Sequence, residues 1–409
     1  LCATTTAGFI CRMNLSTAAP LVMQEFGLSQ IAMGRVFSSF YLGYAFLQVP
    51  SGILADRWGT RKIYRWAISL WILFTLLQAL VGWGSWQQSL GVELLLLMAL
   101  RFLLGASSAP AYPAASKGVS DWVPAPLRGM ANGVVLSSIG LGSALAPLLV
   151  SGLMITYGWR VALLASALPA LLVALAWMRA QSPPSKIIVQ PLIGQGRHPE
   201  YNSNAHALKS RPFLLLTLSY SLQGYVGYIF ISWFYIYLVQ ERHFGLLSGA
   251  WMSSLPWALS IVSIPLGGWL ADRLAQSRLG TVWGRRIIPM LGLGLSGLLI
   301  SVGAHTDSAV VAAITLAFAT AFVLCVEGPS WAMMNHIAGQ QSGRAGGIMN
   351  MGCNICGLLS PVITPVLATY VGWETTLHLA ALIAVFAALL WWGIGSTDVL
   401  EAPALTTTT

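Results

Sequence analysis

An arginine stands in the middle of the first long apolar segment of the chain, in the stretch FICRMNLSTAAP at residues 9–20. No carboxylate lies beside Arg12 in the sequence. A guanidinium at membrane depth is costly, so it must face a partner, a cavity or a ligand rather than lipid. Arg12 is therefore predicted to attract an anion, because its planar fork donates two parallel hydrogen bonds to a carboxylate.

Other polar side chains interrupt the apolar segments, and together they make an anion-binding set. Besides Arg12, the candidates for substrate contact are Tyr44, Arg101, Gln223, Trp331, Asn350 and Asn354. Arg101 could equally brace the fold, and tyrosine and tryptophan in membrane helices are usually packing or interface anchors. Asn350 and Asn354, four residues apart and therefore on one helix face, could instead bond helix to helix.

A carboxylate also lies within an apolar segment, Glu327 in VEGPSW. An ionisable residue at membrane depth is a functional candidate by default. We hypothesise that Glu327 binds and releases a coupling proton. A structural salt bridge to Arg12 or Arg101 is the competing interpretation.

The histidines and cysteines are expected to carry no chemistry. His243 and His336 look loop-bound and His378 lies in the last apolar segment, so none is assigned a role. Cys353 and Cys356 form a CxxC inside an apolar helical run, with no second pair or histidine at metal spacing. Nucleophile triads and phosphate loops are absent as well. We therefore expect no metal, no cofactor and no enzymatic activity.

These side chains need membrane-crossing helices to position them. The chain has 409 residues, 56% hydrophobic and only 8% charged, with a mean hydropathy of +0.73. A soluble fold of this length would need far more charge to cover its surface. Apolar runs long enough to cross about 30 Å of hydrocarbon predict an all-α polytopic membrane protein with twelve transmembrane helices. They span roughly 1–22, 31–55, 63–81, 92–116, 134–155, 161–178, 213–239, 248–270, 287–302, 309–333, 346–370 and 375–394.

The net charge of +9 could suggest a nucleic-acid partner, but the placement of the basic residues decides otherwise. Alternate loops collect them, namely Arg57, Arg61, Lys62, Arg65, Lys117, Arg128, Arg179, Lys186, Arg197, Lys209, Arg211, Arg273, Arg278, Arg285, Arg286 and Arg344. The opposite loops hold Arg160 and Arg242. This positive-inside asymmetry places both termini and the central loop in the cytoplasm. The predicted surroundings are a lipid bilayer, with no nucleic acid.

The apolar runs form two copies of one six-helix unit. GILADR at 52–57 recurs as GWLADR at 268–273, and a proline stands twelve residues before both Trp159 and Trp373. Such parallel repeats occur in transporters, with the binding site at the repeat interface. The predicted parts are an N-terminal bundle at 1–180, a cytoplasmic linker at 181–211, a C-terminal bundle at 212–395 and a cytoplasmic tail at 396–409.

The segment GILADRWGTRK resembles the GxxxDRxGxRK loop of the major facilitator superfamily, and its second copy and the twelve apolar runs make the match specific. The resemblance implies two pseudo-symmetric six-helix bundles that alternate access to a central site. It also implies a charged latch, whose groups pair in one state and separate in another. The gating candidates are Gly52, Asp56, Arg57, Arg61, Asp272 and Arg273. Plain loop charges that obey topology are the alternative.

Longer stretches resemble the anion:cation symporter family, which carries sugar acids, other organic anions and inorganic phosphate. They are CRMNLSTAAP followed by EFGLS, FYLGYAFLQVPSGILADRWG, RFLLGASSAPAYPAAS and WFYIYL, and the likeness covers nearly the whole chain. In that family the residues that match Arg12 and Tyr44 contact the substrate carboxylate. An asparagine at a place like Asn350 contacts the substrate hydroxyls.

Two positions depart from the family pattern. The family usually has an aspartate directly before the arginine that matches Arg12, and a glutamate in a GxGEAP segment. At these two places this chain has Cys11 and Ser108. Those acids are the family's usual proton carriers, and neither cysteine nor serine can replace a carboxylate that titrates in the physiological range. The internal repeat places Glu327 opposite Ser108, which favours Glu327 as the group that took over the proton.

The sequence therefore predicts a secondary active transporter of a small organic anion, a sugar acid or related carboxylate, with protons as a candidate coupling ion. A facilitated anion carrier, an organophosphate/phosphate exchanger and a non-transporting membrane sensor are the alternatives. The exchanger is disfavoured because it usually wants a second arginine in the segment at 214–239, which contains none. Short external loops favour a multi-pass protein of a bacterial inner membrane. The missing initiator methionine suggests a trimmed N-terminus.

Overall fold

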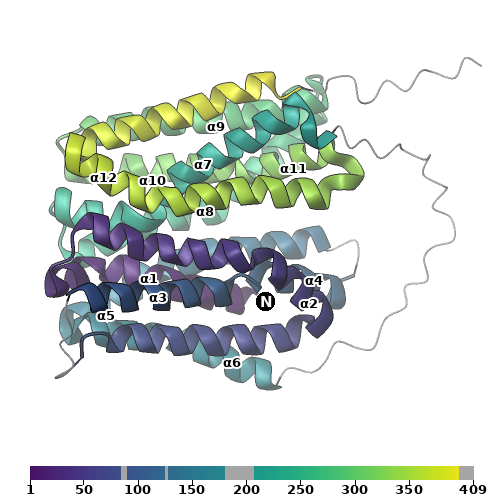
Figure 1. Ribbon diagram of the computed structural model, residues 1–409. Helices are drawn as coiled ribbons and strands as arrows, with labels where there is room; N and C mark the ends of the chain where they lie inside the picture. The colour runs from purple at the N-terminus through teal and green to yellow at the C-terminus, as the bar shows by residue number, and fades with distance from the viewer. Residues whose placement is uncertain (84–89, 125–127, 180–206, 396–409) are drawn as a thin grey trace, which may run out of the picture.

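The chain folds into long helices that lie side by side (Figure 1). The computed structural model describes residues 1–83, 90–124, 128–179 and 207–395. The surroundings of some residues inside helices, among them Gly52 and Asp56, are also outside the described set. The helices are α1 Cys2–Phe26, α2 Gln30–Leu80, α3 Leu90–Ser108, α4 Ala111–Trp122, α5 Arg128–Ser166, α6 Leu168–Arg179, α7 Arg211–Ile236, α8 Leu246–Ala275, α9 Gly280–His305, α10 Ala309–Cys325, α11 Glu327–Ala338 and α12 Ser342–Leu390. His336, which was expected in a loop, lies in the last turn of α11.

Three of these helices are bent at a glycine, which divides each of them into two helical segments. Gly59 in α2, Gly158 in α5 and Gly372 in α12 have φ of 72°, 81° and 81°, a left-handed conformation that favours glycine. Elsewhere one crossing is assembled from two shorter helices, as at 91–122, where α3 is followed by α4. Eight helices among the described residues are long and apolar enough to cross a membrane, and two of these, at 133–179 and 344–393, contain a glycine bend. When the bent helices are divided at their glycines and the paired short helices are joined, the order of helical segments follows the twelve apolar runs.

The helices separate into two groups that follow the internal repeat. In Figure 1 the purple and blue helices, α1 to α6, lie below the green and yellow helices, α7 to α12. Gly158 and Gly372, which are equivalent in the repeat, have nearly the same backbone conformation, with ψ of 165° and 161°. The described ends of the two groups are Arg179 and Arg211, so most of the predicted linker and the whole predicted tail fall outside the described residues.

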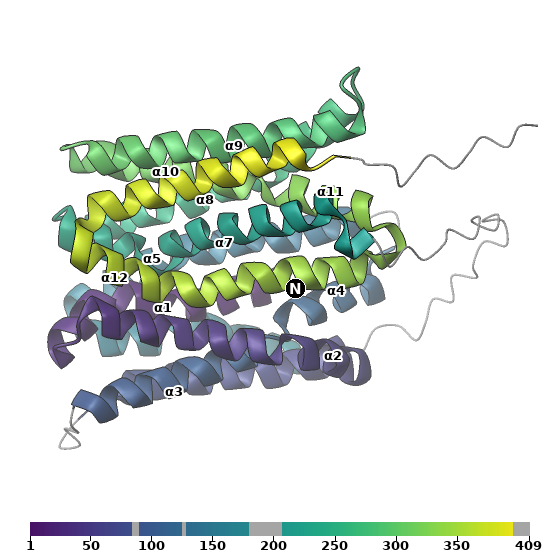
Figure 2. The ribbon, with the colours of Figure 1, turned by 45° about the horizontal axis from the view of Figure 1, so that its top comes forward.

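Contacts between the two halves concentrate toward the end that lies opposite the basic loops. Figure 2 shows α12 beside α7 and next to α2 of the other half, and both pairs are in contact. Near this end, Gln30 donates to Gln240 at 3.2 Å and Ser151 donates to the carbonyl of Leu246 at 2.7 Å. Deeper in the bundle, Ser254 donates to the carbonyl of Ala144 at 2.7 Å. These hydrogen bonds join the halves at this end and deeper in the bundle.

Candidate functional site

A cavity reaches the middle of the N-terminal half and contains Arg12. Its lining comes from the first four helices and consists of Thr4, Thr5, Gly8, Phe9, Arg12, Phe40, Tyr44, Tyr64, Trp71, Ser108, Ala111, Tyr112 and Ala115. Arg12 lies near the midpoint of α1, whereas Thr4 and Thr5 lie two turns nearer its start. The start of α1 is at the end of the molecule where α4 and α11 lie (Figure 1). The cavity therefore extends from mid-membrane toward the side of the basic loops.

Aromatic rings surround the guanidinium of Arg12. Its central carbon lies 5.1 to 5.9 Å from the ring centroids of Phe9, Phe40, Tyr41, Tyr44 and Tyr228. Tyr228 belongs to the C-terminal half, so the cage is closed by both halves. Aromatic faces attract a cation by their quadrupole, but they leave its N–H donors without strong acceptors. The cage holds the positive charge in place and keeps it available to an anion.

The hydrogen-bonding capacity of Arg12 is not used up by the protein. Its Nε is buried and has no hydrogen-bond partner, and the ion pairs found among the described residues do not involve Arg12. The neighbouring Cys11 is buried and points its sulfur at the carbonyl oxygen of Ser166, 3.9 Å away. Ser108, at the other position where the related family has an acid, lines the cavity as a neutral hydroxyl. The charge of Arg12 is therefore uncompensated by a neighbouring carboxylate.

Arg101 lies behind Arg12 and is not among the residues that line the cavity. Its side chain is 2% exposed, and its Nη2 donates to the backbone carbonyl of Arg12 at 3.2 Å. α2 and α3 can approach closely here because glycine faces the partner backbone on both sides. A Cβ at Gly105 would lie 1.9 Å from the carbonyl oxygen of Phe40, and one at Gly43 would lie 2.1 Å from that of Phe102. The hydrogen bond from Arg101 to the carbonyl of Arg12 thus ties α3 to the backbone of α1 at the level of the site.

Glu327 forms a polar cluster on the facing half. It begins α11, directly after the interruption at Val326, and accepts three hydrogen bonds from neutral donors. Tyr220 Oη donates to Oε1 at 2.5 Å, Gln223 Nε2 to Oε2 at 3.2 Å and Trp331 Nε1 to Oε1 at 3.3 Å. This brings the predicted residues Gln223, Glu327 and Trp331 together. The alternative of a salt bridge from Glu327 to Arg12 or Arg101 is wrong, since neither pair occurs among the ion pairs of the described residues.

The cluster of Glu327 and the aromatic cage of Arg12 share helix α7. Tyr220 and Gln223 of this helix donate to Glu327, and the ring of Tyr228, one to two turns farther along it, lies beside the guanidinium of Arg12. The two polar groups are therefore positioned by neighbouring turns of one helix.

Asn354 joins the two halves on the basic-loop side of the cage. Its Nδ2 donates to Gln48 Oε1 at 2.7 Å, and its Oδ1 lies 3.5 Å from Tyr228 Oη. Helix-to-helix bonding, the structural alternative, is thus present for Asn354. Asn350 is half-buried one turn away on the same helix, and no hydrogen bond of its side chain is found in the described structure. Its role as a substrate contact stays a prediction.

The gating candidates lie at the ends of α2 and α8. The surroundings of Gly52 and Asp56 are outside the described structure, and Arg57 is exposed. Arg61 donates to the carbonyl of Met178 at 3.4 Å, and Asp272 pairs with Arg285 at 3.6 Å. Arg273 lies over the ring of Trp269. Each of these contacts stays within one half, and the role of these residues in a latch between the halves stays a prediction.

Sequence reasoning missed several residues of the site. Tyr220 donates the shortest hydrogen bond to Glu327, and Gln48 binds Asn354. Helical spacing could have found both, because Tyr220 lies three residues before Gln223 and Gln48 lies four residues after Tyr44. The aromatic cage could not have been found in this way, since its rings come from three separate helices.

Comparison with known proteins agrees with this architecture. The family model described as Major Facilitator Superfamily matches residues 1–358. The chain belongs to the major facilitator superfamily. A bacterial homologue of the human lysosomal transporter Spinster, solved in an inward-facing and unoccupied conformation, aligns with a TM-score of 0.79 at 18% identity, covering 96% of this chain and 95% of that one. A D-xylose–proton symporter aligns with a TM-score of 0.76 at 15% identity over 96% of each chain.

Several relatives of this superfamily member are named as transporters of organic anions. A probable sulfoacetate transporter of Cupriavidus necator is 31% identical, covering 87% of this chain and 83% of the relative. A probable galactarate/D-glucarate transporter of Bacillus subtilis is 29% identical over 88% of this chain and 82% of the relative. The hexuronate transporter of Bacillus subtilis is 28% identical over 93% and 90%. This member is a multi-pass membrane protein with the fold of alternating-access transporters.

Proposed function

We propose that the chain is a secondary transporter of a small organic anion, a sugar acid or a related carboxylate or sulfonate, bound by Arg12 between the two halves. The observation that carries the proposal is a guanidinium in a mid-membrane cavity with a buried, unpartnered Nε and no ion pair among the described residues. A charge left unpaired at this depth is costly, so an anionic cargo gains the free energy of neutralising it. The relatives named for sulfoacetate, galactarate/D-glucarate and hexuronate support this class of cargo.

Glu327 supplies the coupling proton in this proposal. All three of its hydrogen-bond donors are neutral, so a proton can neutralise the carboxylate without stranding a buried cation. A cargo with a second anionic group, such as a dicarboxylate or a sulfocarboxylate, would meet like charge at Glu327 and bind best when Glu327 is protonated. Binding of cargo and of proton would then favour each other.

The orientation follows from the loop charges. The basic loops would lie in the cytoplasm of a bacterial inner membrane, with both termini and the linker on that side. The cavity extends toward those loops, and the hydrogen bonds near Gln30 and Ser151 close the opposite side, which supports an inward-facing conformation. Exchange between this conformation and its outward-facing counterpart would carry the cargo across.

Uptake into proteoliposomes tests the proposal. The panel contains labelled sulfoacetate, glucuronate, glucarate and a sugar phosphate, each supplied with and without an inward proton gradient. Accumulation of an acid that is lost in Arg12→Gln supports the proposal, and dependence on the proton gradient supports coupling. Equilibration without accumulation would indicate a facilitated carrier, exchange of the sugar phosphate for phosphate would indicate the exchanger, and binding without movement would indicate a sensor.

A further inference from the structure

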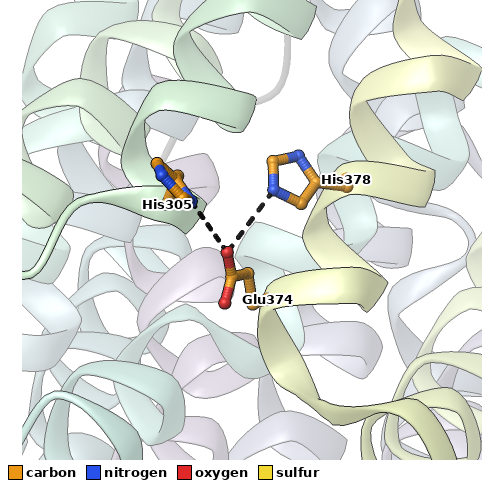
Figure 3. A group of neighbouring side chains, drawn as sticks. All are labelled: His305, Glu374 and His378. Atoms are coloured by element: carbon orange, nitrogen blue, oxygen red, sulfur yellow. Dashed lines mark hydrogen bonds and ion pairs between the residues drawn. The ribbon is translucent and has the colours of Figure 1, made fainter.

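Three side chains of types that can bind metal ions meet at the end of the C-terminal half that lies opposite the basic loops. His305 ends α9, whereas Glu374 and His378 follow the bend of α12 at Gly372. Figure 3 shows the Glu374 carboxylate pointing between the two imidazole rings. His305 Nδ1 lies 3.0 Å and His378 Nε2 3.8 Å from the same oxygen, Glu374 Oε1.

The distances among the three groups suit ligands of one ion. Imidazole nitrogen and carboxylate oxygen bind Zn²⁺ at about 2.0 to 2.2 Å, so two ligands of one ion lie at most about 4.2 Å apart. Both distances to Glu374 fall inside this limit, and the three ligand atoms all lie within 4.8 Å of one another. The exposed imidazole of His305 can close the remaining gap by a small rotation.

Both imidazoles lie within ion-pair distance of the same carboxylate oxygen. His305 with Glu374 would suffice as an exposed ion pair, which contributes little to stability. His378 Nε2 at 3.8 Å is too far from the carboxylate for a hydrogen bond. Glu374 and His378 are four residues apart, so they share a face of α12 and aim at the same point beside α9. The two rings and the carboxylate thus place three ligand atoms within reach of one point between α9 and α12.

The helices that carry the ligands are held in place by their neighbours. Arg242 donates to the carbonyls of Gly303, Ala304 and Thr306 at 3.0, 3.0 and 2.7 Å, and so fixes the end of α9 beside His305. Its Nε donates to Tyr237 Oη, whose ring packs on Trp373 at 5.5 Å. The Arg242 charge opposes a second cation, but its donors are committed to these acceptors. A rigid support of this kind favours metal binding at modest affinity.

We propose that His305, Glu374 and His378 form a binding site for a divalent first-row transition metal ion, with Zn²⁺ as the best fit. Two imidazoles and one carboxylate suit zinc, cobalt, nickel or copper rather than the all-oxygen sites of magnesium and calcium. Three protein ligands leave a position for water. Because α9 and α12 belong to the same half, the ion ties two helices of one bundle together and does not lock the two halves against each other.

The test uses the full-length protein, purified with a tag that contains no histidine and reconstituted in nanodiscs. Zn²⁺ binding is measured by calorimetry, and Co²⁺ binding by its visible absorption, which reports the coordination number. The variants are His305→Gln, Glu374→Gln and His378→Gln. The matched control is His243→Asn, which removes another histidine near the same end of the molecule; its φ of 55° is tolerated by asparagine.

We expect one Zn²⁺ per chain with micromolar affinity, a Zn²⁺-dependent rise in the thermal unfolding midpoint, and at least a tenfold loss of affinity in each ligand variant. His243→Asn should bind as the wild type does. Unchanged binding in His305→Gln, whose wild-type side chain is 83% exposed, would overturn the proposal without any concern about folding. Absence of saturable binding at millimolar Zn²⁺, or an equal loss in His243→Asn, would overturn it as well.

Discussion

Replacement of Arg12 should separate the two parts of its interaction with an anion, charge and geometry. Arg12→Lys keeps a positive charge in the aromatic cage but loses the planar fork, whereas Arg12→Gln loses both. The cage rings at 5.1 to 5.9 Å can hold an ammonium as they hold the guanidinium. The two variants therefore differ mainly in what they offer the cargo.

The expected magnitude follows from the number of hydrogen bonds at stake. Each hydrogen bond to a charged group contributes roughly 1.5 kcal/mol or more, so a bidentate carboxylate contact is worth about 3 kcal/mol. Since 1.4 kcal/mol corresponds to a tenfold change in affinity, Arg12→Gln should weaken cargo binding by roughly 100-fold. Arg12→Lys, which retains one such bond, should weaken it by roughly tenfold.

The assay is equilibrium binding of the best cargo from the uptake panel to protein in nanodiscs, with initial uptake rates measured in parallel. Arg35→Gln is the matched control, because it removes an exposed guanidinium from α2 outside the cavity lining. Thermal unfolding checks that each variant is folded. Retention of affinity within threefold in folded Arg12→Gln would refute the assignment of the anion to this residue.

Three further predictions concern the opposite wall, the helix crossing and the contact between halves. Glu327→Gln should abolish the rise of uptake with falling external pH while retaining cargo binding, as measured at two external pH values; a pH response equal to that of the wild type would exclude the proton role. Gly105→Val should lower the free energy of unfolding by about 1 to 3 kcal/mol, because its Cβ would meet the carbonyl of Phe40 at 1.9 Å; an unchanged unfolding midpoint would contradict the close crossing. Asn354→Ala breaks the 2.7 Å hydrogen bond to Gln48 between the halves. Cysteines in the space between the halves should then react faster with a thiol reagent added from the basic-loop side, and Gln48→Ala should have the same effect. Opposite effects of those two variants would show that the bond does not hold the halves together.

The internal repeat explains why so much of the fold could be predicted. GILADR and GWLADR predicted two copies, and the structure repeats the same glycine bend at Gly158 and Gly372. Twelve apolar runs were recognisable because a bilayer imposes length and hydropathy on each crossing. The end of a run was harder to locate, as His336 in α11 illustrates, because the helix continues beyond the hydrocarbon core.

The candidate site was only partly accessible from sequence. Arg12, Glu327, Gln223 and Trp331 were identifiable because polar groups are conspicuous in apolar helices. The proposed metal-binding cluster could not be found from the sequence, because His305 and Glu374 are 69 residues apart and meet only where α9 packs on α12.

Composition and local pattern by themselves determined that this chain is a membrane-spanning helical protein, duplicated, with an arginine inside an apolar segment and no carboxylate beside it in the sequence. These features depend on the free energy of transferring individual side chains into hydrocarbon, which is a property of each residue type. The tertiary structure alone decided which groups share a space. It caged Arg12 in five rings, surrounded Glu327 with neutral donors instead of an arginine, and turned Arg101 toward the backbone of α1. Such partnerships depend on how helices cross and rotate, and those are set by side-chain packing between distant segments.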